Sequence, residues 1–194
     1  MNRRLSVGQY RSIDLTLFAI MTAVFEIVVV NAARFWFPGE PYAISMVPLI
    51  TAIVMIRWGW WAALHALLGG VVYCLASGGT GQQMAVYGIG NLASLGAMIM
   101  VKRLGAGRIS GSSLLTVAFG ACIVLLMQLG RAVISLAFGA TLINASGFFT
   151  TDVITLLFTL TVLWIVRRLD GVFEDQRHYL SRLREEQERE RGGI

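Results

Sequence analysis

The chain has little charge for its length, because only 14% of its 194 residues are Asp, Glu, Lys or Arg. A soluble domain of this size carries about 25%. Proline and cysteine are also scarce, with three and two residues. Both cysteines, Cys74 and Cys122, fall inside apolar runs, and no Cys/His cluster with metal-ligand spacing occurs. The sequence therefore predicts neither a disulfide framework nor a zinc site, and we expect no cofactor.

Catalytic motifs are missing from the sequence as well. There is no Walker A loop, no H-E-x-x-H and no G-x-S-x-G, and the acidic residues do not form paired clusters. No nucleophile lies beside a base in the sequence. We therefore expect that the protein is not an enzyme.

Apolar residues are abundant, at 56% of the chain, and the mean hydropathy is +0.69. They run nearly unbroken for about 15 to 25 residues at a time, which is the length of a membrane-crossing helix. A soluble enzyme, a nucleic-acid-binding domain and a disordered protein do not fit this pattern. The pI of 9.8 reflects arginines beside apolar segments. The sequence predicts an all-α integral membrane protein that lies in a lipid bilayer and binds no nucleic acid.

Six segments reach or approach the length of a membrane span and predict a six-transmembrane-helix bundle over residues 1–166. The first is expected to be a retained helix and not a cleaved signal peptide. The second has about 14 residues and would also fit a re-entrant segment. The six predicted spans are 13–33, 43–56, 58–77, 84–101, 112–138 and 147–166.

Basic residues gather on one side of this topology. Fourteen of the 16 lysines and arginines fall with the two termini, the 57–58 turn and the 102–111 loop, whereas the opposite loops offer Arg34 alone. This asymmetry predicts a multi-pass protein of the cell membrane with both termini in the cytoplasm. Three tryptophans are then expected at the cytoplasmic interface: Trp58, Trp60 and Trp61.

Residues 167–194 are predicted to form a separate, charged cytoplasmic segment, with seven arginines and seven acidic residues. Its apolar residues recur at spacings of three and four, which indicates an amphipathic helix. Such a helix either lies on the inner leaflet or in solvent, or docks on a cytoplasmic partner. The residues of this stripe are Leu169, Phe173, Gln176, Leu180 and Leu183.

Polar side chains inside the predicted spans are costly in lipid and therefore suggest a function. Counting about 1.5 Å per residue places Glu26, Asn91, Arg131 and Asp152 between the midplane and the outer surface, on four different helices. We therefore predict one substrate-binding site that opens to the outside. Its candidate residues are Glu26, Trp36, Tyr42, Tyr87, Asn91, Gln128, Arg131 and Asp152.

Two interpretations of these polar residues remain open. In the first, Arg131 binds a carboxylate or phosphate of a ligand. In the second, Arg131 forms an internal ion pair with Asp152 or Glu26 that only holds the helices together. The aromatic loop 34–42 likewise predicts either a lid that stacks on a flat ligand or an interfacial belt.

Small residues and one histidine complete the set of candidates. The pattern Ala19-x-x-x-Ala23 permits close approach of another helix, although Glu26 shares that side of the helix. His65 is expected either to form a hydrogen bond between helices or to ligate a haem iron.

The layout of residues 12–166 resembles that of the substrate-binding S components of energy-coupling factor (ECF) transporters. The resemblance rests on six spans, cytoplasmic termini and a first helix that opens Asp14-Leu-Thr-Leu-Phe-Ala-Ile-Met-Thr-Ala23. It implies that Ala19 and Ala23 contact a membrane coupling subunit. It also implies an outward-facing pocket, capped by the loop between spans one and two and lined mainly by spans four to six.

This resemblance implies that the chain captures a vitamin or a related micronutrient. A coupling subunit and two cytoplasmic ATPases would then drive its release into the cell. Alternatives from other classes are a multi-span structural protein like the rod-shape factor MreD and a membrane sensor that signals through its tail. A haem-binding S component that uses His65 is a further alternative.

Overall fold

The computed structural model describes residues 6–36, 38 and 44–192, and these residues form helices without a strand. Five helical stretches are long and apolar enough to cross a membrane. The structure is therefore all-helical and compatible with a multi-pass membrane protein. The five stretches are Val7–Trp36, Val47–Ser77, Gly81–Leu104, Ser113–Ala137 and Leu142–Val166.

The second stretch consists of two helices and not one. Helix α2 (Val47–Trp58) ends at Gly59, whose φ of +63° lies in the left-handed region. After the short 3₁₀ helix η1 (Gly59–Trp61), helix α3 (Ala62–Ser77) packs back against α2. Gly69 of α3 lies against Val47 at the far end of α2. The two helices therefore form an antiparallel hairpin, and α2 starts four residues later than the predicted span 43–56.

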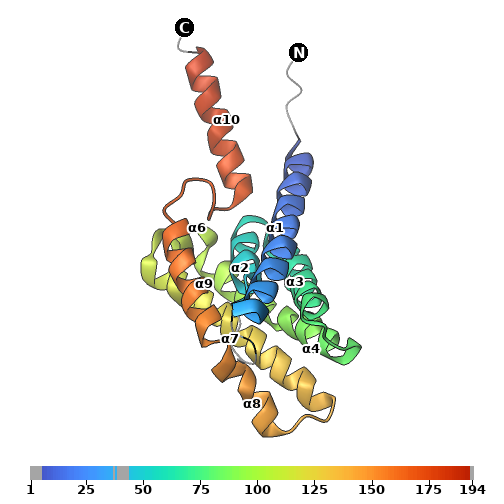
Figure 1. The fold of residues 1–194 in the computed structure, drawn as a ribbon. Coiled ribbons are helices and arrows are strands. Elements are labelled where there is room, and N and C mark those ends of the chain that lie inside the picture. Colours follow the sequence, from blue (N-terminus) through green and yellow to red (C-terminus); the bar gives the residue numbers. More distant parts are fainter. Residues whose placement is uncertain (1–5, 37, 39–43, 193–194) are drawn as a thin grey trace.

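Helix α2 lies in the middle of the bundle (Figure 1). All twelve of its residues are buried, and it packs against α1 (Val7–Trp36), α3, α7 (Ser113–Ala137) and α9 (Val153–Val166). At 1.5 Å per residue it is about 18 Å long, whereas the hydrocarbon core of a bilayer is about 30 Å thick. Neighbouring helices surround it on every side, which explains why its sequence is apolar all round.

The fourth predicted span, 84–101, is helical throughout but changes its winding. Helix α4 (Gly81–Asn91) tightens into the 3₁₀ helix η2 (Leu92–Ala97) and continues as α5 (Met98–Leu104). The change falls directly after the buried residue Asn91. A 3₁₀ segment inside a longer helix often marks a functional hinge.

The last predicted span, 147–166, starts earlier and is interrupted. Helix α8 (Leu142–Thr151) begins where the hydroxyl of Thr141 accepts a hydrogen bond from a backbone N–H group. It ends at Asp152, after which α9 begins. The Asp152 side chain therefore projects from the junction of two helices.

The charged tail is not one helix from residue 167. Residues 167–175 form an irregular linker, and helix α10 (Gln176–Gly192) follows it. Phe173 and Gln176 are buried, and the Phe173 ring lies 6.5 Å from that of Phe119. The predicted amphipathic helix starts nine residues late because Phe173 anchors the linker to the bundle.

Helix α10 extends away from the bundle on the side where α1 begins (Figure 1). We call this side, where α1 begins and α9 ends, the arginine-rich end. A short helix, α6 (Ala106–Gly111), also lies there. The basic residues of this end of the bundle are Arg11, Arg57, Lys102, Arg103, Arg108, Arg167 and Arg168.

Candidate functional site

Arg131, on α7, is the centre of a buried polar network. Its Nε donates to Oδ1 of Asn91 at 2.8 Å, and its Nη1 donates to Oδ2 of Asp152 at 2.7 Å and to Oε1 of Gln128 at 3.2 Å. Gln128 also donates to Asp152. Arg131 is 4% exposed, whereas the Asp152 side chain is 17% exposed. Four of the sequence-predicted residues therefore meet in one network.

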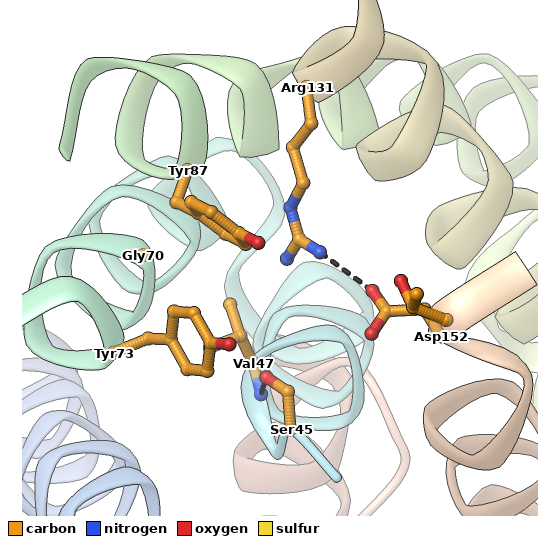
Figure 2. A pocket seen from close by; sticks show the side chains of 8 residues that line it. Ser45, Val47, Gly70, Tyr73, Tyr87, Arg131 and Asp152 are labelled. Atoms are coloured by element: carbon orange, nitrogen blue, oxygen red, sulfur yellow. Dashed lines mark hydrogen bonds and ion pairs between the residues drawn. The ribbon is translucent and has the colours of Figure 1, made fainter. Parts of the chain in front are cut away.

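Aromatic rings form one wall of this network. The Tyr87 ring centroid lies 4.7 Å from Cζ of Arg131, which is a cation–π distance. Tyr73 and Phe148 flank Tyr87, with ring centroids 4.9 and 5.8 Å from it. In Figure 2 the hydroxyl groups of Tyr73 and Tyr87 point into the same space as the guanidinium group of Arg131.

One nitrogen of this guanidinium is unused. Nη2 of Arg131 has no hydrogen-bond acceptor among the residues that the structure describes. Arg131 lines a cavity of about 40 Å³. A guanidinium group with a free edge binds carboxylates and phosphates, so the cavity suits one anionic group. The cavity is lined by Ser45, Val47, Gly70, Tyr73, Tyr87, Arg131, Thr151 and Asp152 (Figure 2).

The cavity is small compared with sites for whole small molecules, which measure about 300–1,000 Å³. It has room for roughly one water molecule or one small polar group. Asp152 occupies only the Nη1 side of the Arg131 guanidinium, so a ligand larger than the cavity would have to displace it.

Two glycines bring α4 and α7 close together beside the network. A Cβ atom on Gly130 would lie 2.0 Å from the backbone oxygen of Gly90, and one on Gly90 would lie 2.8 Å from the backbone nitrogen of Arg131. Any side chain at these positions would push the two helices apart. The close approach allows Arg131 to reach Asn91 on the neighbouring helix.

Glu26 lies outside the Arg131 network, although its depth in the sequence suggested a shared site. Its fully buried carboxylate accepts hydrogen bonds at Oε1, from the backbone N–H of Met46 at 2.6 Å and the hydroxyl of Ser45 at 3.0 Å. These groups directly precede α2, so Glu26 caps the positive end of that helix. Its Oε2 has no hydrogen-bond partner among the described residues. Ser45 also lines the cavity beside Arg131, so a single hydrogen bond connects Glu26 to the cavity wall.

The predicted aromatic lid is described only in part. Trp36 ends α1 and is 68% exposed, and its ring packs edge-on against Phe35 at 6.2 Å. Tyr42 lies outside the described residues. The stacking role of Trp36 and Tyr42 stays a prediction.

The remaining predicted residues lie closer to the arginine-rich end. The two ring nitrogens of His65 face the backbone oxygens of Leu15 at 3.0 Å and of Trp61 at 3.4 Å. His65 therefore links α3 to α1. Ala19 and Ala23 are half-buried on α1, and their contact with a coupling subunit stays a prediction.

Sequence reasoning missed a polar cluster at the end of α2 opposite the cavity. Arg57 is buried and forms two hydrogen bonds of 2.8 Å with the carboxylate of Asp14. Its Nη1 also donates to the backbone oxygens of Gly171 and Val172 in the linker. Trp58, expected at the membrane interface, is buried and donates to Asp14 instead. Nothing in the sequence pairs Arg57 with an acid 43 positions away.

Tyr73 was also missed, although a signal for it existed. It follows His65 and Gly69 at intervals of four residues, so the three share one face of α3. His65 and Gly69 are buried, and continuing that stripe by one turn would have placed Tyr73 in the interior.

Comparison of the chain with protein-family models, with curated protein sequences and with solved structures found no match in any of the three.

Proposed function

We propose that the chain is the substrate-binding S component of an ECF-type importer and captures a small ligand that carries an anionic group. The observation that carries this proposal is the free Nη2 of Arg131 at the wall of a polar cavity. A guanidinium edge that faces a cavity can form charge-assisted hydrogen bonds with a carboxylate or phosphate. An anionic ligand would supply such an acceptor.

The neighbours of Arg131 fit a ligand with an anionic and a planar part. The hydroxyls of Tyr73 and Tyr87 would donate to the anion, and their rings offer a flat apolar surface. Asp152 holds the position beside Arg131 when no ligand is bound. A ligand of vitamin size would displace Asp152 and extend past it, with α8 moving outward.

Transport would depend on other proteins, since the chain has no Walker A loop. On this proposal, the face of α1 with Ala19 and Ala23 meets a membrane coupling subunit, and two cytoplasmic ATPases supply the energy. The layout of helical stretches supports this assignment, and so does the excess of arginines at the end where α1 begins and α10 lies (Figure 1).

The proposal is tested by native mass spectrometry of protein purified gently from a rich-medium culture. We expect a small molecule with a carboxylate or phosphate to co-purify with the wild type. Tyr73→Phe removes one hydroxyl from the cavity and should weaken retention of that molecule, whereas Tyr179→Phe in the tail should not. If no adduct appears and no vitamin raises the unfolding temperature in a screen, the binding function is wrong.

A structural protein of the rod-shape factor type is the second candidate. It is favoured by the ion pair between Arg131 and Asp152, which fills the site, and by the small cavity. Such a protein would bind other proteins and show no ligand-dependent stabilisation. The same screen therefore separates the two candidates.

A further inference from the structure

A second cavity, distinct from the Arg131 network, lies at the arginine-rich end. Its volume is about 320 Å³, which is enough for a phosphate headgroup. It is formed where the start of α1, the turn between α2 and α3 and the start of α10 come together. Its charged residues and exposed tryptophans are Arg11, Arg57, Trp60, Trp61, Asp175 and Arg177.

The charges of this cavity do not balance within the protein. Arg57 is paired with Asp14, and Asp175 accepts the backbone N–H of Arg177 at the start of α10. The side chains of Arg11 and Arg177 form no hydrogen bond or ion pair with any residue that the structure describes. Two guanidinium groups thus line the same cavity without an acceptor, and with the carboxylate of Asp175 beside them one positive charge is in excess.

Tryptophans place the cavity at the level of lipid headgroups. Trp60 and Trp61 are 55% and 42% exposed. Cζ of Arg11 lies 4.9 Å from the Trp61 ring centroid, and Nζ of Lys102 lies 5.1 Å from that of Trp60. Exposed tryptophans beside basic side chains are typical of the membrane–water interface.

An exposed apolar surface leads from the cavity toward the bilayer centre. Leu64 and Leu67 lie three residues apart near the start of α3, so they share one side of that helix, directly after Trp60 in η1. Both leucines are exposed. Acyl chains of a lipid whose headgroup sits in the cavity would pack on these two side chains.

We propose that this cavity binds the phosphate of an anionic phospholipid, with Arg11 and Arg177 as the two cationic ligands. The two unpaired charges favour an anion, and the interfacial tryptophans and the adjoining apolar surface favour a lipid over a soluble anion. This assignment does not depend on the transport function. Each basic residue near an anionic membrane surface contributes about fivefold to affinity.

The test compares three purified proteins in detergent: the wild type, Arg11→Gln/Arg177→Gln, and a control that removes two exposed charges elsewhere at this end, Arg103→Gln/Arg108→Gln. Each is titrated with phosphatidylglycerol or phosphatidylcholine, with bound lipid read by native mass spectrometry and stability by thermal unfolding. We expect wild type and control to prefer phosphatidylglycerol. The cavity variant should lose that preference roughly 20- to 30-fold while unfolding like the wild type in phosphatidylcholine.

Three outcomes would overturn the proposal. Equal losses in both variants would mean a diffuse charge effect without a site. A wild type without preference for phosphatidylglycerol would mean that no anionic lipid binds. If glycerol phosphate, which lacks acyl chains, stabilises the wild type as well as phosphatidylglycerol at the same concentration, the ligand is a soluble anion and not a lipid.

Discussion

Arg131 and Asp152 depend on each other, because removing either one leaves a charge without its counter-ion in a largely dry site. Breaking a buried pair from one side destabilises by about 3–5 kcal/mol, and we expect the lower value here since Asp152 is partly exposed. Arg131→Gln should therefore unfold more easily than the double variant Arg131→Gln/Asp152→Asn. Unfolding of the wild type, Arg131→Gln, Asp152→Asn and the double variant in detergent measures this coupling. Strictly additive effects of the two substitutions would contradict the ion pair.

Glu26 is expected to act as a helix cap and not as a ligand-binding residue. Glu26→Gln keeps the acceptor Oε1 and should change the free energy of unfolding by about 1 kcal/mol or less. Glu26→Ala leaves the Met46 N–H and the Ser45 hydroxyl without that acceptor and should destabilise by about 2–3 kcal/mol. Thermal unfolding distinguishes the two variants. If Glu26→Gln lost a co-purified ligand while its stability stayed unchanged, Glu26 would be a ligand-binding residue and not only a helix cap.

At the level of helices, the contact between α4 and α7 depends on the absence of side chains at Gly90 and Gly130. Gly130→Ala would place a methyl group 2.0 Å from the Gly90 oxygen and should destabilise by about 1–3 kcal/mol or more. Gly147→Ala in α8 is the matched control, since nothing lies within 4 Å of its added Cβ. That control should be neutral or stabilise by up to about 1 kcal/mol. Similar unfolding temperatures for both variants would exclude the close contact.

Arg57 joins the C-terminal end of α2 to the linker before α10, so its loss should free the tail before it unfolds the bundle. We expect trypsin to cut residues 167–175 of Arg57→Gln at least severalfold faster than in the wild type. Arg182→Gln breaks two surface ion pairs, with Asp170 and Glu174, each of which contributes at most about 1 kcal/mol, and serves as the control. Equal cleavage rates in the two variants would show that Arg57 does not hold the linker.

Sequence patterns predicted most helices because long apolar runs and their flanking charges follow from the membrane alone. The ends of α2 and α10 were predicted less well, for a common reason. The sequence 43–58 reads as a short apolar run, and only tertiary packing reveals that other helices enclose it on every side. In the tail, Phe173 fits a helical stripe, but its burial against Phe119 outweighs the local helical pattern.

For the candidate site, depth along the helices was enough to bring Asn91, Arg131 and Asp152 together, and Gln128 joins them because it shares the Arg131 side of its helix. Depth was not enough for Glu26, because two residues at one level can face different neighbours across the bundle. Ser45 carries no charge and lies before α2, so its contribution to the cavity emerges only from packing, whereas Tyr73 lies on the helical stripe of His65 and Gly69.

For the whole molecule, the distribution of arginines predicts which end faces the cytoplasm. In intact cells, Ser146→Cys in α8 should react with a membrane-impermeant maleimide, whereas Ser181→Cys in α10 should react only after permeabilisation. The native Cys74 is buried and Cys122 is half-buried, so both are replaced by alanine in the background. The reverse pattern of labelling would invert the predicted orientation.

The enclosure of α2 has a consequence for how the chain enters the membrane during synthesis. A twelve-residue segment is too short to partition into lipid as a separate span, and before the bundle assembles it has no protein surroundings. The insertion machinery should therefore receive residues 47–77 as a single hydrophobic unit. The bend at Gly59 would form only later, when the other helices displace lipid from around α2. Assembly of the interior is then a late event in biogenesis, and a ribosome-bound chain that ends near residue 110 should still lack it.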